Sequence, residues 1–133
     1  LKYDIFITAK ECRSIRVTLR GDALALKGEH QGIYWKTKMY NGRPSWTMAD
    51  SVPRYKRKAI WWSQYKFWAI GDFYYTGSST GGSIDTCYPT AGTCPPTNGP
   101  PYTAGIVWQY YDGVYWKETT TEVIVECIRF IGK

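Results

Sequence analysis

The sequence predicts a single all-β domain, a small antiparallel sandwich or a partly closed barrel, and three observations predict it. Apolar and polar residues alternate with a period of two wherever a pattern is clear, as strands require. Turn signals recur at intervals of roughly 8–12 residues, which is typical of antiparallel sheets. No amphipathic stretch of about ten or more residues has helical spacing. A chain of 133 residues fits one domain, because two would each have too small a core.

The first part of the chain after residue 11 predicts one strand and a turn. Ile15, Val17 and Leu19 alternate with polar residues, so residues 15–19 are expected to form a half-buried strand. Gly21-Asp22 then predicts a turn. Residues 23–27 fit either a short strand or a helical turn, and we favour the strand.

Residues 33–70 predict a run of hairpins. The strand at 33–40 ends at Asn41-Gly42, a turn signal in which both residues can adopt positive φ. Pro44 follows and cannot donate a ladder hydrogen bond, so the returning strand is expected at a sheet edge. Two more strands are expected at 59–62 and 66–70.

The last third of the chain changes in composition and then returns to strands. Residues 76–102 are rich in Ser, Thr, Gly and Pro, so they predict a long loop that cannot form a sheet interior and is compositionally open to O-linked sugar. Asp112-Gly113 predicts a hairpin whose returning strand starts at Val114. β-branched residues at 123–130 predict the final strand.

Four cysteines in a small, loop-rich chain favour two disulfides and an oxidising compartment over a zinc site. A zinc site needs closely spaced ligands, and the chain has one histidine. We expect Cys12 to pair with Cys127, because each lies beside an alternating strand near one terminus. Cys87 and Cys94 would then close a local loop.

The net charge of +6 is partly concentrated in one cluster, Arg54, Lys56, Arg57 and Lys58. Such a cluster beside aromatic residues can bind nucleic acid, an acidic polysaccharide or an acidic protein. It is also typical of a solvated hairpin edge that discourages strand pairing, which is the interpretation we favour. Disulfides place the protein outside the cell, so no nucleic-acid partner is expected. No apolar run is long enough for membrane insertion.

Seven Trp and twelve Tyr are more than a core of this size needs, so some are expected on recognition surfaces. Core packing is the competing role, and we expect at least half of the candidates to be buried. The candidate ligand- or partner-binding aromatics, any coplanar pair of which could stack on sugar rings, are Trp62, Trp68, Tyr74, Tyr75, Trp108 and Trp116.

The sequence predicts no enzyme, metal site or cofactor. His30 is expected in a surface turn, where it is exposed or satisfied rather than catalytic. Asp72 and Asp112 could form a glycosidase carboxylate pair, but a strand end and a turn explain them better. No G-x-S-x-G, phosphate-binding loop or G-x-G-x-x-G motif is present.

A series of signals in fixed order resembles a secreted module that occurs, often in tandem, in large extracellular proteins of invertebrates and unicellular algae. The pattern is G-x-Y, N-G-R-P-x-aromatic, an aromatic cluster, W-x-I-G, C-P, W…W and V-x-V-x-C. Here it falls on Gly32/Tyr34, Asn41–Pro44 with Trp46, Trp61/Trp62, Trp68/Ile70/Gly71, Cys94/Pro95, Trp108/Trp116 and Val123/Val125/Cys127. The resemblance implies an extracellular, disulfide-bridged, non-enzymatic building block.

Residues 1–11 lie outside that pattern, yet Tyr3, Ile5 and Ile7 alternate as in a strand. They could form an ordinary edge strand of their own domain. They could also dock on a sheet edge of a neighbouring copy, which would link subunits head to tail.

Together these features predict a secreted structural or adhesive module that contacts copies of itself or other extracellular matrix components. The alternative is a lectin-like module that binds acidic or neutral glycans.

Overall fold

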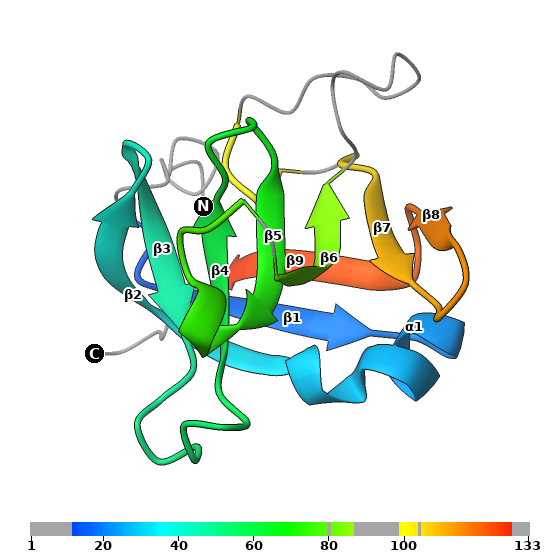
Figure 1. The fold of residues 1–133 in the computed structure, drawn as a ribbon, viewed down its shortest axis with the longest axis horizontal. Coiled ribbons are helices and arrows are strands. Elements are labelled where there is room, and N and C mark those ends of the chain that lie inside the picture. The colour runs from blue at the N-terminus through cyan, green and yellow to red at the C-terminus, as the bar shows by residue number, and fades with distance from the viewer. Residues whose placement is uncertain (1–11, 80, 87–98, 104, 129–133) are drawn as a thin grey trace.

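A computed structural model describes residues 12–79, 81–86, 99–103 and 105–128. Within these residues nine antiparallel strands form one sheet that curves into a nearly closed barrel (Figure 1), so the all-β prediction is confirmed. The strands are β1 (Ser14–Leu19), β2 (Gly32–Tyr40), β3 (Arg43–Thr47), β4 (Lys58–Trp62), β5 (Trp68–Asp72), β6 (Gly82–Thr86), β7 (Trp108–Tyr111), β8 (Trp116–Thr119) and β9 (Val123–Ile128).

The sheet follows the order β8-β7-β6-β5-β4-β3-β2-β1-β9. Consecutive strands are therefore neighbours from β1 to β8, and only β9 returns to pair with β1. In Figure 1 β1 and β9 run side by side and cross behind β4, β5 and β6 at a steep angle. This crossing encloses the core.

The predicted alternation of β1 is confirmed, because Ile15, Val17 and Leu19 are all buried. They pack with the rings of Trp46 and Trp68, whose centroids lie 5.9 Å apart. Burying an aromatic or branched side chain contributes roughly 1.5–3 kcal/mol. An aromatic core inside one curved sheet is thus the main source of stability.

Residues 23–27 are not a strand. They belong to α1 (Gly21–Lys27), which continues into the 3₁₀ turn η2 (Gly28–His30). Ala and Leu favour helix, Asp22 lies in the first turn and Lys27 in the last, as the helix dipole prefers. The segment is too short for helical periodicity to reveal it.

The Asn41-Gly42 hairpin is confirmed, with φ of 53° and 85° at its two residues. The edge position expected for Pro44 is wrong, since β3 lies between β2 and β4. β4 pairs with β3 only at Trp46 and Thr47, so its ladder stops before Pro44. The missing N–H of Pro44 therefore costs no ladder hydrogen bond.

The loop expected at 76–102 contains a strand. β6 lies between β5 and β7, and Ile84 is fully buried in the core. The Thr86 hydroxyl accepts a hydrogen bond from the Trp68 N–H at 2.9 Å, which joins β6 to the start of β5. The sequence did not predict β6, because Ile84 is a single apolar residue between polar neighbours and shows no alternation.

The hairpin at Asp112-Gly113 is also confirmed, but its loop spans residues 112–115 and β8 begins at Trp116 rather than Val114. Asp112 shapes this loop, because its carboxylate accepts hydrogen bonds from the N–H groups of Val114 (2.8 Å) and Tyr115 (2.7 Å).

The disulfide between Cys12 and Cys127 is confirmed, with Cα atoms 5.9 Å apart. It joins the start of β1 to β9. The predicted Cys87–Cys94 bridge, the alternation of residues 1–11 and residues 129–130 of the last strand lie outside the described residues. No helix in the described part of the chain is long and apolar enough to cross a membrane.

Candidate functional site

The most accessible pairing surfaces are the two ends of the sheet, which we call the β8 edge and the β9 edge. Each of these strands has a neighbour on one side, and no other described strand pairs with its second side. Residues 120–122 connect them, and the Thr119 hydroxyl holds this turn by accepting from the N–H groups of Thr121 (3.1 Å) and Glu122 (2.9 Å).

The register fixes which backbone groups of β9 face outward. Arg20 donates its N–H to the Glu122 carbonyl at 2.9 Å, next to the pair Leu19 and Val123. Hydrogen-bonded pairs alternate in an antiparallel ladder, so Ile124, Glu126 and Ile128 direct their backbone groups toward β1. The N–H and C=O groups of Val125 and Cys127 point away, toward the β9 edge.

The side chains beside this edge are incompletely covered. Val125 and Cys127 face the core opposite Val17 and Ile15, yet both are only partly buried, whereas their β1 partners are fully buried. The outer face of β9 carries one charge, Glu126, which forms an exposed ion pair with Arg16 at 3.2 Å. The β9 edge therefore combines backbone groups that no described strand pairs with and apolar side chains that are only partly buried.

The β8 edge has a different character. β8 has four residues, its first three side chains are exposed, and two of them are the charged residues Lys117 and Glu118. Short, charged edge strands resist further pairing. The two edges are thus chemically unequal.

Three of the six predicted recognition aromatics are not on the surface. Trp62, Trp68 and Trp108 lie in the core, so the expectation that they bind ligands is corrected, while the expected burial of half the set is confirmed. Trp62 packs edge-on against Trp68 with centroids 5.2 Å apart. Side chains along a strand alternate between the two faces of the sheet, and on β4, β5 and β7 these three rings lie on the face that forms the main core.

The other three aromatics are exposed but do not form a coplanar pair. Tyr74 and Tyr75, on the 3₁₀ turn η3 (Phe73–Tyr75), meet at an interplanar angle of 87°. Trp116 lies on β8 and contacts Tyr111 at 52°. Neither pair offers one flat platform.

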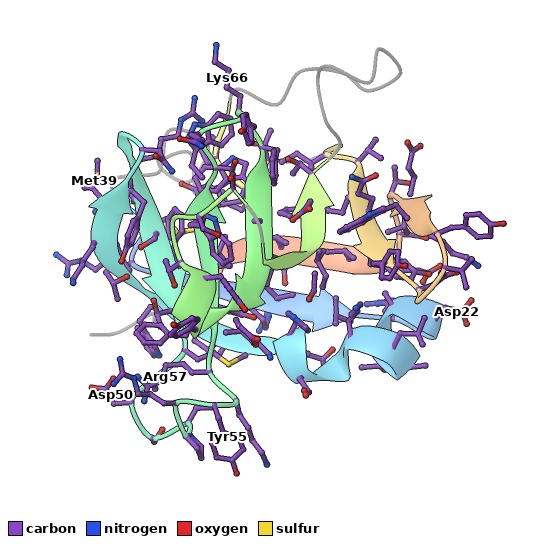
Figure 2. All side chains as sticks on the ribbon, viewed as in Figure 1. Asp22, Met39, Asp50, Tyr55, Arg57 and Lys66 are labelled. Atoms are coloured by element: carbon purple, nitrogen blue, oxygen red, sulfur yellow. A yellow bond between two sulfur atoms is a disulfide. The ribbon has the colours of Figure 1, made fainter. Side chains whose placement is uncertain are left out.

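The basic cluster divides into structural and exposed residues. Lys58 is buried and forms an ion pair with Asp72, its cross-strand partner on β5. Arg57 donates hydrogen bonds to the carbonyls of Val52 at 2.9 Å and Asp50 at 3.2 Å, and its guanidinium lies 5.3 Å from the Phe73 ring centroid. These two residues hold the β3–β4 loop, shown by Asp50 and Arg57 in Figure 2.

Arg54 and Lys56 are exposed on the same loop. The hairpin-edge interpretation of this cluster is wrong, since β4 lies inside the sheet. What remains exposed is a small basic patch of two residues.

A groove of about 410 Å³ lies on the outer face of the sheet, where no sequence motif predicts it. Its lining includes Trp35, Thr37 and Lys38 of β2, Thr47 of β3, and Arg57 and Phe73 from other segments. The volume falls within the roughly 300–1,000 Å³ of typical ligand sites. Trp35 is 41% exposed. Trp35 is next to the buried Tyr34 on β2, and alternation along a strand is the sequence signal that predicts an outward-facing Trp35.

Two buried titratable groups lie elsewhere. Burial is the main cause that lowers the pKa of His30 to about 4, and its Nδ1 lies 3.1 Å from the Lys27 carbonyl. His30 is thus buried rather than in the surface turn expected. Burial likewise raises the pKa of Asp85 on β6 to about 7. The described residues contain no group of three His, Cys, Asp or Glu side chains able to hold a metal ion.

No protein-family profile, curated protein or solved structure matches this chain. The resemblance to secreted modules therefore stays a prediction, and the function must be argued from the sheet edges and the groove.

Proposed function

We propose that this chain is a non-enzymatic, extracellular structural module that assembles with copies of itself by strand addition at the β9 edge. The observation that carries the proposal is the edge itself, where Val125 and Cys127 present outward backbone groups beside partly covered side chains. An added strand satisfies such groups and covers such side chains. The donor is residues 1–9 of a second copy, in which Tyr3, Ile5 and Ile7 alternate.

Chain geometry supports a donor from another molecule. A strand antiparallel to β9 runs in the same direction as β1, so its last residue lies beside Val123, at the far end of β9 from Cys12. Six residues of β9 span about 20 Å. Residue 9 is three residues from Cys12, and the chain between them reaches only about 11 Å. If residues 1–9 pair antiparallel along the whole of β9, they therefore come from a second copy.

Assembly of this kind is head to tail. Each copy donates its N-terminal strand and accepts another at β9, so the contact does not close on itself and generates a filament. The confirmed disulfide supports an oxidising location and fixes β9 to β1 beside the acceptor edge. The proposal requires no catalytic group, metal or cofactor.

Deletion of residues 1–9 tests the proposal. We expect the full chain to self-associate with increasing concentration and the truncated chain to stay a folded monomer. Light scattering measures mass, circular dichroism measures folding, and negative-stain electron microscopy shows filaments. A synthetic peptide of residues 1–11 should bind the truncated chain and, in excess, inhibit assembly of the full chain.

Two results would overturn the proposal. If the truncated chain unfolds, residues 1–9 are a strand of their own domain. If it still polymerises, assembly uses another surface. A peptide with the same composition in scrambled order is the matched control, because it lacks the alternation of residues 3, 5 and 7.

A further inference from the structure

The pairing of β1 with β9 gives the barrel two distinct ends. At the end where β1 begins, the disulfide joins Cys12 to Cys127, and we call it the Cys12 end. At the other end Leu19 pairs with Val123 and the chain continues into α1, and we call it the Val123 end. The β2–β3 hairpin and α1 lie toward opposite ends of the long axis of the molecule in Figure 1.

The Cys12 end is basic. The β2–β3 hairpin has no carboxylate, and its cations are Lys36, Lys38 and Arg43. Arg13 is exposed directly before β1, where its carbonyl accepts a hydrogen bond from the Lys36 N–H at 2.8 Å. The one charge on the outer face of β9, Glu126, is balanced by Arg16. The described residues of this end therefore carry a net positive charge.

The Val123 end is acidic. Burial is the main cause that raises the pKa of Tyr110 to about 12, and the nearby carboxylates of Glu122, Asp22 and Asp112 add to the shift. Two of these three are engaged within the molecule. Glu122 accepts a hydrogen bond from the Tyr110 hydroxyl at 3.0 Å, and Asp112 lies 3.8 Å from the Lys117 ammonium group. Asp22 is the member of this group that stays exposed.

Arg13 and Asp22 are thus exposed charges at opposite ends, and within the described part of the chain neither forms an ion pair. Arg20 precedes Asp22 by two positions, and residues at that spacing do not face each other on a helix. Lys10 and Glu11 have opposite charges, so the sequence before Arg13 does not change the sign of its end.

Strand addition at the β9 edge brings these two ends together. In the proposed contact, residue 9 of the donor lies beside Val123 of the acceptor. Arg13 of the donor is four residues further along, within about 14 Å of residue 9. Asp22 of the acceptor is three residues beyond Leu19, the β1 partner of Val123, and lies within about 11 Å of it. The basic end of one copy therefore lies next to the acidic end of the following copy.

We infer that Arg13 of one copy forms an ion pair with Asp22 of the next copy, a contact that rests on the proposed strand addition. Opposite charges meet only when copies join head to tail, because a contact between two like ends would place like charges together. The pair therefore reinforces the direction that strand addition sets. Since both side chains are exposed, salt should weaken the pair.

Charge exchange in the full chain tests the pair. Arg13→Glu and Asp22→Arg each place like charges at the contact, and each should raise the concentration at which light scattering detects assembly by about threefold or more. The double variant Arg13→Glu/Asp22→Arg restores opposite charges and should return this concentration to that of the parent. Lys56→Glu changes the net charge as much as Arg13→Glu does, but it lies on the β3–β4 loop and should have no effect.

Circular dichroism shows that each variant is folded, and 1 M NaCl, where the Debye length is about 3 Å, should largely abolish the differences between variants. The inference is overturned if a single variant assembles like Lys56→Glu, if the double variant assembles no better than the single variants, or if the differences persist in 1 M NaCl. Strand addition stands in these cases, provided that assembly of the parent still requires residues 1–9. A parent chain that stays monomeric overturns the proposed function and this inference together.

Discussion

The β8 edge and the β9 edge lie at opposite ends of one sheet and differ in the properties that govern strand pairing. β8 has four residues with exposed charges at Lys117 and Glu118. β9 has six residues, partly uncovered Val125 and Cys127, and a disulfide to β1. The β8 edge is therefore the less suited of the two to pairing with a further strand.

On the proposed function, the β9 edge is a contact surface rather than an unprotected end of the sheet. Both edges are products of the same chain order, yet β8 exposes two charged side chains in four residues, whereas β9 exposes one, Glu126, which pairs with Arg16. The disulfide ties β9 to the residues that precede β1, and no described strand pairs with the other side of β9.

Removing the disulfide should have the largest effect on stability. Replacing both Cys12 and Cys127 by Ser releases a covalent link across 115 residues, and we expect the free energy of unfolding to fall by about 2–5 kcal/mol. Urea unfolding of the parent and of the double variant measures it. An unchanged midpoint would mean that β9 does not depend on this bond.

Proline substitutions at two adjacent positions of β9 should affect different properties, stability at Ile124 and assembly at Val125. Ile124→Pro removes an N–H that points to β1 and should cost about 3 kcal/mol or more. Val125→Pro removes an outward N–H and should cost less, on the order of 1 kcal/mol, yet weaken assembly. Urea unfolding and light scattering separate the two effects. Equal losses of stability would contradict the register argument for the β9 edge.

His30 and Asp85 should make the folding stability depend on pH in opposite senses. His30 lies on η2, which contacts β1, and its folded pKa is about 4 against 6.5. The contribution of neutral His30 to the free energy of unfolding is complete above pH 6.5 and is lost as the pH falls toward 4. Stability therefore rises with pH in that window. Asp85, on β6 toward the β8 edge, has a folded pKa of about 7 against 3.8, so its contribution falls as pH rises toward 7.

Between pH 4 and 6.5 these slopes, roughly 1.4 kcal/mol per pH unit each, should largely cancel in the parent. His30→Leu should leave a stability that falls with pH, and Asp85→Asn one that rises. Urea unfolding across this window measures both slopes. The same slope in both variants would show that one of these groups is not buried as described.

The smallest effect is expected at the β8 edge. The N–H groups of Tyr115 and Val114 lower the pKa of Asp112, so its contribution is present above pH 3.8 and lost as pH falls through the lower folded value. Acid should then loosen the 112–115 loop while the disulfide still holds β9. Amide exchange of Val114 and Tyr115 by NMR reports this, and Asp112→Ala should show the loosened loop at neutral pH. Unaltered exchange in that variant would contradict the role of Asp112.

The sequence was most informative where it contains a long alternating pattern, a strong turn signal or a pair of cysteines. Alternation predicted β1, Asn41-Gly42 predicted the β2–β3 hairpin, and the position of two cysteines beside terminal strands predicted their bridge. These signals are local or involve one pair of residues. They do not require knowledge of strand order.

What the sequence missed depends on strand order. Pro44 was expected at an edge because the partial pairing of β3 with β4 cannot be read from one strand. Trp62, Trp68 and Trp108 were candidate ligand contacts because the face of β4, β5 and β7 that lines the core emerges only in the curved sheet. The groove joins β2, β3 and η3, which no local motif connects.

Hydrogen exchange along β9 tests the central claim most directly. In the full chain above its assembly concentration, the amides of Val125 and Cys127 should be protected, and on dilution they should exchange rapidly. The amides of Ile124 and Glu126, which face β1, should stay protected at both concentrations. Fast exchange of Val125 and Cys127 in the assembled protein would contradict strand addition at the β9 edge, and protection that does not change on dilution would mean that the chain covers this edge itself.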